Sequence, residues 1–263
     1  MITTLGLPFD EHSSYLRGPA EGPAAIRVAF HSSSSNYFTE SGIDLHNHSL
    51  LKDDGDLDLS ESKKIIENIS KKVEKIVKIS PKILCLGGDH SVTYPVVQAV
   101  SSIHTNLNIL HIDAHADVYD EFEGNKFSHA CPFARIMETK LVKRLVQIGI
   151  RTLNDHQRDQ IKKFGIETIE MKDWTDQHEL KFDGPLYISL DMDAFDPAFA
   201  PGVSHHEPGG FTSRQVIALI QNLKEDIVGA DIVELNPDRD INEMTAILAA
   251  KVYKEILAKM IEP

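Results

Sequence analysis

Hydrophobic positions follow two patterns that alternate along the chain. Short runs of apolar and β-branched residues predict buried strands, and stretches with an apolar residue at every third or fourth position predict helices. The clearest helical pattern covers residues 60–80, where isoleucines and valines form one stripe opposite lysines. We expect strands at residues 2–7, 82–86, 107–112, 145–150, 166–171, 186–190 and 227–235, and helices at residues 24–30, 60–80 and 245–260 and beginning near Ser91, Asn154 and Thr212.

This alternation predicts the fold class. It runs through all 263 residues without a linker or an internal repeat. We therefore predict an α/β protein in which residues 1–263 form a single three-layer α/β/α domain around a mostly parallel sheet. Ligands of such sheets bind beyond the carboxyl ends of the strands.

Composition and charge limit the classes of partner. The chain has 41% hydrophobic and 25% charged residues, which is typical of a globular protein. Its formal net charge of −13 argues against nucleic acid and anionic membranes as partners and suits a small cationic molecule. We expect a cytoplasmic protein, because the sequence shows no signal peptide or membrane-spanning apolar run, and Cys85 and Cys131 show no disulfide pattern.

Polar residues cluster after three of the predicted strands. The clusters are Asp89 and His90 after the second strand, Asp113, His115 and Asp117 after the third, and Asp191 and Asp193 after the sixth. If the chain stays extended from residue 113 to residue 117, the alternation of a strand puts the second cluster on one face. Taken singly, an Asp-x-Asp motif can be a turn and His90 a residue that starts a helix, but three clusters at one sheet edge favour a shared site.

The chemistry of these side chains favours divalent metal ions. Carboxylates with two imidazoles suit hard or borderline ions, and no thiolate is offered to zinc. Buried carboxylates without a partner are costly, so a cation is expected among them. Six side chains around one ion would exclude water, whereas two ions roughly 3.5–4 Å apart could share them and activate a bridging water.

Four motifs in these regions resemble those of the ureohydrolases, the family of arginases, agmatinases and their relatives. They are Gly-Gly-Asp-His at 87–90, Asp-Ala-His-Ala-Asp at 113–117, Ser-Leu-Asp-Met-Asp-Ala-Phe-Asp-Pro at 189–197 and Glu-Pro-Gly-Gly at 207–210. Residues 127–138 resemble the plant-type arginase/agmatinase branch. The resemblance covers nearly the whole chain and implies an arginase-deacetylase-like fold with two manganese ions.

The resemblance also implies which residues hold the ions. One ion would be bound by His90, Asp113, Asp117 and Asp191, and the other by Asp113, His115, Asp191 and Asp193. Asp113 and Asp191 would then bridge the two ions. Two such ions lower the pKa of a shared water, which lets it attack a guanidinium group that plain water attacks too slowly.

Two further residues match catalytic positions of the family. The glutamate that matches Glu234 pairs with the guanidinium group, although the residues alone leave Glu234 as a possible exposed acid at a strand end. The histidine that matches His129 shuttles the proton that the amine leaving group needs. Asp117 is expected to serve catalysis as well as metal binding. The aspartates and Glu234 leave this site with excess negative charge, so the resemblance and the charge both imply a small cationic guanidino substrate.

The substrate is predicted from positions that would face its distal end. Tyr119 and residues 152–154 depart from the residues with which animal and bacterial arginases read the amino-acid end of arginine, and residues 31–36 contain neither Lys nor Arg. We therefore predict agmatine, hydrolysed to putrescine and urea, as the main substrate. The plant-type branch shares these departures and Arg17 could supply a cation, so arginine and other guanidino acids are the alternatives.

Two other classes of protein share parts of this pattern. A deacetylase-like amidohydrolase uses a single zinc ion, and Asp193 and the Gly-Gly-Asp-His motif argue against it. A metal-binding relative without activity would keep the ligands, and His129 argues against that class. Because the family forms trimers and hexamers, we expect a homo-oligomer.

Overall fold

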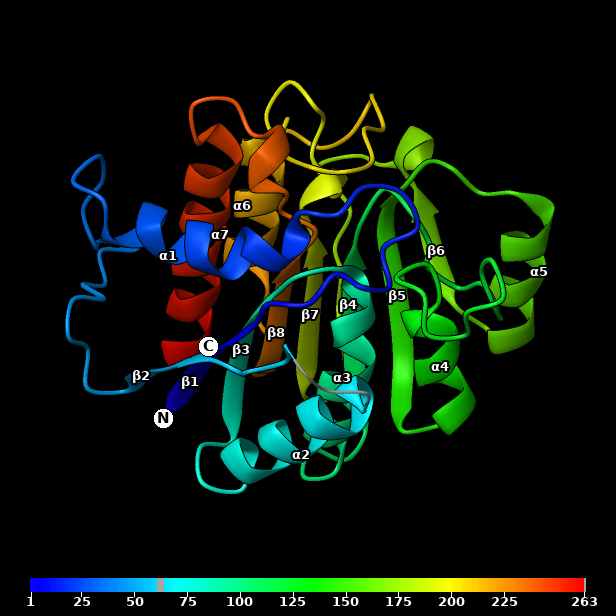
Figure 1. Cartoon of the computed structure of the whole chain (residues 1–263), viewed down its shortest axis with the longest axis horizontal. Helices are drawn as coiled ribbons and strands as arrows, with labels where there is room; N and C mark the ends of the chain where they lie inside the picture. The colour runs from blue at the N-terminus through cyan, green and yellow to red at the C-terminus, as the bar shows by residue number, and fades with distance from the viewer. Residues whose placement is uncertain (61–63, 263) are drawn as a thin grey trace.

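One parallel sheet organises the molecule (Figure 1). The computed structural model describes residues 1–60 and 64–262, and among these residues eight strands form one sheet. The strands are β1 (Ile2–Leu7), β2 (Leu51–Asp56), β3 (Lys82–Gly87), β4 (Leu107–Ile112), β5 (Val142–Ile150), β6 (Glu167–Glu170), β7 (Leu186–Asp191) and β8 (Ile227–Val233).

The order of the strands in the sheet differs from their order in the chain. The sheet runs β2-β1-β3-β8-β7-β4-β5-β6, and each neighbouring pair is parallel. The prediction of a mostly parallel sheet is confirmed, and the described sheet is parallel throughout. The strands β3, β8, β7 and β4 therefore lie side by side in its middle, with their carboxyl ends at one edge.

Helices cover both faces of the sheet and make the predicted three layers. They are α1 (Gly22–His31), α2 (Ile65–Val77), α3 (Thr93–Ser101), α4 (Pro132–Thr139), α5 (Asp155–Phe164), α6 (Ser213–Asn222) and α7 (Met244–Ile261). The helices α1, α6 and α7 pack on one face, and α2, α3 and α4 pack on the other (Figure 1). Each face has its own hydrophobic core, so the chain is a single α/β domain.

Local sequence signals explain where several helices begin. The side chain of Asn154 accepts a hydrogen bond from the backbone of Gln157 and starts α5, and Thr212 does the same for α6 through Gln215. Gly165 ends α5 in a left-handed conformation. The predicted caps of these two helices are confirmed.

Among the α-helices and strands of the described residues, two were not predicted and one is shorter than predicted. The strand β2 (sequence LKDDGD) lacks an apolar run because it lies at the edge of the sheet and its charged side chains are exposed. The helix α4 begins at Pro132, which suits a first helical position. The helix predicted at 60–80 is observed as α2, from residue 65 to residue 77. Its predicted first turn falls on residues 61–63, which lie outside the described residues.

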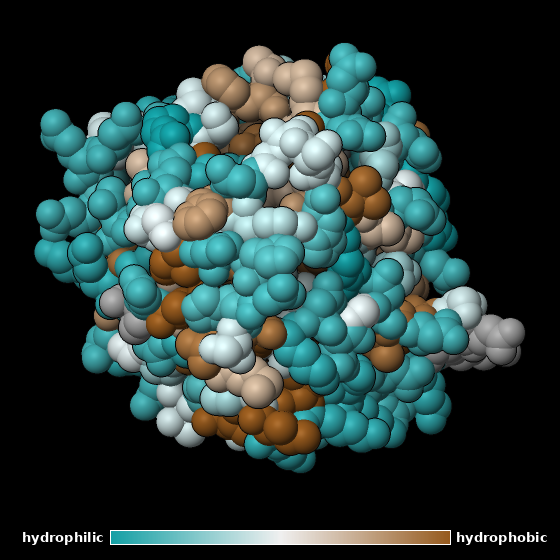
Figure 2. Space-filling view, turned by 90° about the vertical axis from the view of Figure 1, so that its left-hand side faces the viewer, coloured by the Kyte–Doolittle hydropathy of each residue, from teal (hydrophilic) through white to brown (hydrophobic). Residues whose placement is uncertain are grey.

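The face of the molecule that carries α1 and β2 is mostly hydrophilic (Figure 2). On the face that carries α1 and β2, hydrophobic residues form separate patches among hydrophilic ones (Figure 2). Within the described residues, no helix combines the length and the apolar character that crossing a bilayer would need.

Candidate metal centre and active site

The predicted ligands lie at the carboxyl ends of the central strands. His90 follows β3, Asp113 follows β4, and Asp191 is the last residue of β7. Asp193 lies in the 3₁₀ turn after β7, and Glu234 follows β8. Because these strands are parallel and adjacent, residues as distant in the chain as His90 and Glu234, which are 144 positions apart, meet at one edge.

Three carboxylates surround the Nδ1 atom of His90. This atom lies 3.2 Å from Asp113 Oδ2, 3.1 Å from Asp117 Oδ2 and 3.2 Å from Asp191 Oδ2. It is buried and makes no hydrogen bond of acceptable geometry. A single ring hydrogen cannot serve three carboxylates, whereas all four atoms can face one metal ion.

A second group forms around His115. Its Nδ1 atom lies 2.9 Å from Asp193 Oδ2 and 3.6 Å from Asp113 Oδ1. The ligand atoms of Asp113, His115 and Asp193 lie within 4.8 Å of one another, as do those of His90, His111 and Asp113. The two oxygens of Asp113 thus face different groups, as expected of a carboxylate that two ions share.

The electrostatics of this cluster fit a cation. Burial raises the pKa of Asp191 well above its usual range, and the charges of Asp193 and Asp113 raise it further. Burial also raises the pKa of Asp193 to about 6, although His115 opposes the shift. Burial therefore disfavours the charged forms of Asp191 and Asp193, whereas two divalent ions would stabilise them as carboxylates.

A buried hydrogen-bond chain orients His90. Its Nε2 atom lies 2.9 Å from the hydroxyl oxygen of Ser189, and that hydroxyl donates to Asp231 Oδ1 at 2.6 Å. Because the serine hydrogen is directed at Asp231, we assign the ring hydrogen of His90 to Nε2. Nδ1 then keeps a lone pair directed at the three carboxylates, as a metal ligand needs. Tyr187 and Thr93 also donate to Asp231.

A further histidine, His111, lies beside Asp113. Its Nε2 atom is 2.7 Å from Asp113 Oδ2, and its Nδ1 atom accepts a hydrogen bond from the amide of Gln147 at 3.0 Å. The ring stacks on Phe133 with ring centroids 3.8 Å apart. Since Gln147 occupies Nδ1, the hydrogen of His111 lies on Nε2 and points at Asp113. This geometry lets His111 orient Asp113, one of the predicted ligands.

Asp117 reaches the centre through a turn. The strand β4 ends at Ile112, and Asp117 has a left-handed backbone with φ of 50°. The chain therefore does not stay extended from residue 113 to residue 117, although the three polar side chains still converge. Glu234 has a φ of 63°. Positive φ at residues other than glycine is costly, and it concentrates at functional sites.

His129 and Glu234 form a buried pair beside the cluster of predicted metal ligands. His129 Nδ1 lies 2.8 Å from Glu234 Oε1, which also accepts the backbone N–H of His90 at 2.9 Å. Burial alone would lower the pKa of His129, but the charge and hydrogen bond of Glu234 prevail and raise it to about 9. Burial would raise the pKa of Glu234, and His129 reverses this and leaves it lowered. Glu234 is therefore a buried ion-pair partner rather than an exposed acid.

The loop after β1 contacts this pair. The backbone N–H of His129 donates to the carbonyl oxygen of His12 at 3.1 Å, and the backbone N–H of His12 donates to Asp89 Oδ2 at 2.9 Å. Ser14 contacts the ring of His129 at Nε2, with its backbone nitrogen at 3.1 Å and its hydroxyl oxygen at 2.8 Å. Asp89 is fully buried, and burial raises its pKa to about 7.

The two positions expected to read the distal end of a substrate contact each other. The side-chain amide of Asn154 donates to the hydroxyl of Tyr119 at 2.5 Å. The guanidinium of Arg17, the suggested additional cation, is paired with Asp10 at 2.8 Å.

The serine-rich loop, residues 31–36, lies away from the ligand cluster. Lys254 of α7 donates to Ser35 Oγ and to the carbonyl oxygen of Asn36, both at 2.9 Å. Among the described residues, this loop makes no hydrogen bond to a predicted ligand or to the pair of His129 and Glu234. The structure therefore gives it no role in the site.

One more unpredicted residue lies over the site. The ring of His205 is half-buried, with its centroid 5.3 Å from that of His129 and 5.8 Å from that of His115. Its position before the Glu-Pro-Gly-Gly motif was the signal that could have identified it. For Asp231, the signal was an acidic residue inside the apolar run of β8.

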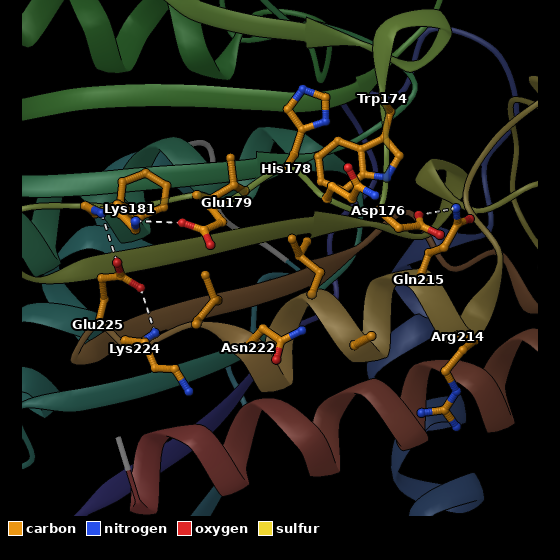
Figure 3. A pocket seen from close by; sticks show the side chains of 16 residues that line it. Trp174, Asp176, His178, Glu179, Lys181, Arg214, Gln215, Asn222, Lys224 and Glu225 are labelled. Carbon is orange, nitrogen blue, oxygen red and sulfur yellow. Dashed lines mark hydrogen bonds and ion pairs between the residues drawn. The ribbon is translucent and has the colours of Figure 1, made fainter.

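A cavity of about 1000 Å³ lies between residues 174–182 and α6, and no predicted site residue lines it. Among its lining residues, Lys181 pairs with Glu179 at 2.6 Å (Figure 3). The cavity therefore takes no part in the candidate active site.

Comparisons with known proteins agree with this geometry. The sequence model of the arginase family matches residues 1–258. The chain is 45% identical to arginase 1 (mitochondrial) of Arabidopsis thaliana, over 97% of this chain and 80% of that protein. It resembles the solved structure of an arginase from Medicago truncatula with a TM-score of 0.92 at 42% identity, covering 98% of this chain and 87% of that one. The agmatine ureohydrolase of Thermoplasma volcanium gives a TM-score of 0.88 at 32% identity, covering 99% and 89%. The chain therefore belongs to the arginase family and is a ureohydrolase of the arginase/agmatinase type.

Proposed function

We propose that the chain hydrolyses arginine to ornithine and urea. The observation that carries this proposal is the 42% identity to the solved arginase of Medicago truncatula, over 98% of the chain, against 32% to the solved agmatine ureohydrolase of Thermoplasma volcanium. This comparison favours arginine as the substrate, whereas the sequence motifs favoured agmatine. The preference for agmatine assumed that the carboxylate of arginine needs a cation in the site. Neutral donors such as the Asn154 amide and the Tyr119 hydroxyl can also bind a carboxylate.

Six residues are proposed to hold two manganese ions. His90, Asp113, Asp117 and Asp191 would hold one ion, and Asp113, His115, Asp191 and Asp193 the other. Support comes from the short distances among these side chains and from the contact of His90 Nε2 with Ser189, which assigns the ring hydrogen to Nε2 and leaves Nδ1 for a metal ion. When bound, the ions would act as Lewis acids and activate a water for attack on the guanidinium carbon.

Glu234 and His129 are the proposed catalytic side chains, with Asp117 acting beside them. The carboxylate of Glu234 would bind the cationic guanidinium group. Glu234 raises the pKa of His129 to about 9, which favours the protonated ring that would give a proton to the departing amine. Replacement of the general acid should reduce the rate roughly 10²- to 10⁴-fold.

Urea release from a panel of guanidines tests the proposal. The manganese-loaded protein should show a higher kcat/KM for arginine than for agmatine or 4-guanidinobutyrate. The His129→Asn and Glu234→Gln variants should lose kcat while retaining manganese, and Glu179→Gln, on the distant cavity rim, should not. A higher kcat/KM for agmatine would refute the arginase proposal. Bound manganese without urea release from any compound would indicate a metal-binding relative without activity.

The oligomeric state and the cellular location remain predictions from the sequence. A trimer or hexamer follows from the family resemblance, and light scattering on the purified protein would measure it. The cytoplasmic location also awaits a direct measurement in cells, since the Arabidopsis relative is described as mitochondrial.

A further inference from the structure

Ser14 is hydrogen-bonded to Nε2 of His129, the ring nitrogen that does not contact Glu234. Nδ1 of His129 faces Glu234 at 2.8 Å, so proton transfer to a substrate must involve Nε2. Within the described residues, Ser14 is the hydrogen-bonding partner of Nε2, through its backbone N–H at 3.1 Å and its hydroxyl at 2.8 Å. His129 is only 8% exposed, so this contact is largely shielded from bulk water.

We infer that Ser14 is a positioning residue, whose hydroxyl keeps His129 hydrogen-bonded in both of its protonation states. The inference rests on the proposed role of His129 as the proton donor. When Nε2 carries no hydrogen, both the backbone N–H and the hydroxyl of Ser14 can donate to it. When Nε2 is protonated, the backbone N–H can no longer bond to it, but the hydroxyl can rotate and accept. A ring that loses and regains one proton per turnover needs a partner of this kind.

The fold presents Ser14 from a segment that is fixed on both sides. On one side, His12 bonds to Asp89, which follows β3. On the other side, the carbonyl oxygen of Arg17 accepts a hydrogen bond from the side chain of Asn236, which follows β8, at 3.0 Å. Both anchors belong to the same edge of the sheet as the ligand cluster. The contact between Ser14 and His129 is therefore built into the site.

The hydroxyl of Ser14 neither gains nor loses a proton in this scheme. The N–H bond at His129 Nε2 breaks as the nitrogen of the departing amine takes the proton, while the C–N bond of the guanidine breaks. Ser14 only changes from acceptor to donor, which holds the ring in place until Nε2 is protonated again. Its loss should affect the chemical step more than substrate binding.

Steady-state kinetics of the manganese-loaded full chain test this inference with three variants. Ser14→Ala removes the hydroxyl and should lower kcat for arginine about tenfold, the effect of one lost hydrogen bond, with KM changed less than about twofold. Ser14→Thr keeps a hydroxyl and should recover most of kcat. The matched control is Ser13→Ala, because Ser13 Oγ lies in the same loop, buried and without a hydrogen bond, and this variant should behave like the unmodified protein.

A double-mutant cycle separates the inference from the function on which it rests. In the His129→Asn background, Ser14→Ala should have no further effect on kcat. Unchanged kcat in Ser14→Ala, failure of Ser14→Thr to recover activity, or an equal loss in both backgrounds would each overturn the inference. Unchanged kcat in His129→Asn alone would instead refute the proposed role of His129. If Ser14→Ala does not fold or load manganese, Ser14→Cys replaces it, since a thiol keeps the volume but hydrogen-bonds weakly.

Discussion

At the scale of single residues, each buried histidine near the ligands has one nitrogen committed to a polar partner. His90 uses Nε2 on Ser189, His111 uses Nδ1 on Gln147, and His129 uses Nδ1 on Glu234. The remaining nitrogen then faces a carboxylate or, for His129, Ser14. The function of each ring therefore depends on a neighbour in another element, which fixes the position of the hydrogen.

The pair of His129 and Glu234 should make stability depend on pH. The pKa of His129 rises from 6.5 to about 9 on folding, so its contribution is complete below pH 6.5 and is lost as the pH rises through about 9. A shift of this size corresponds to a contribution on the order of 3 kcal/mol. Urea unfolding of chelator-treated protein at about pH 6 and about pH 9.5 should show the loss. His129→Asn should lack this loss, and an equal decline in both proteins would contradict the coupling.

At the scale of elements, prediction succeeded where burial imposes an apolar pattern. The strands β4 and β7 are buried along their whole length, and both were expected within one residue of their observed bounds. The strand β2 was missed because an edge strand needs no apolar run. The proposed ligands could be named from the sequence because they directly follow buried strands and match family motifs. Asp231 and His111 were missed because they lie inside strands, where only contacts across the sheet show their role.

The strand β5 supports the centre through a glycine. Gly149 has a φ of 87°, and a Cβ atom there would lie 2.8 Å from the carbonyl oxygen of Asp113 and 2.8 Å from the ring of Phe211. Gly149→Ala should therefore lower the free energy of unfolding by more than the roughly 1–2 kcal/mol of left-handed backbone strain. It should also weaken manganese binding. Gly165→Ala is the matched control, because its φ is 65° and nothing lies within 4 Å. The prediction would be contradicted if urea unfolding showed the same loss of stability in Gly149→Ala and Gly165→Ala and if manganese affinity were unchanged in both.

At the scale of the whole molecule, the centre joins four strands that come from distant parts of the chain. Its buried carboxylates repel one another, and this repulsion opposes the packing of the two cores against the sheet. A ligand that binds only the folded protein stabilises it. The proposed ions should therefore act as a structural support as well as in catalysis.

Removal of metal should lower thermal stability. At a free manganese concentration about a hundredfold above the dissociation constant, one bound ion adds about 2.7 kcal/mol to the free energy of unfolding. Dialysis against a chelator should lower Tm by several degrees, and added manganese should restore it. Asp191→Asn removes a ligand proposed for both ions, so its Tm should respond little to manganese. A Tm of the unmodified protein that is independent of manganese would show that the cluster holds no ion.

The order of the strands has a consequence for synthesis on the ribosome. The strands β3 and β4 emerge early but are not neighbours in the sheet, and the gap between them is filled by β7 and β8, which emerge last. Nascent chains shorter than about the first 235 residues would therefore carry His90, Asp113 and Asp117 without β8, and those shorter than about 190 residues would also lack β7. Loading of metal would be a late event in the life of each chain, after the last strand has entered the middle of the sheet.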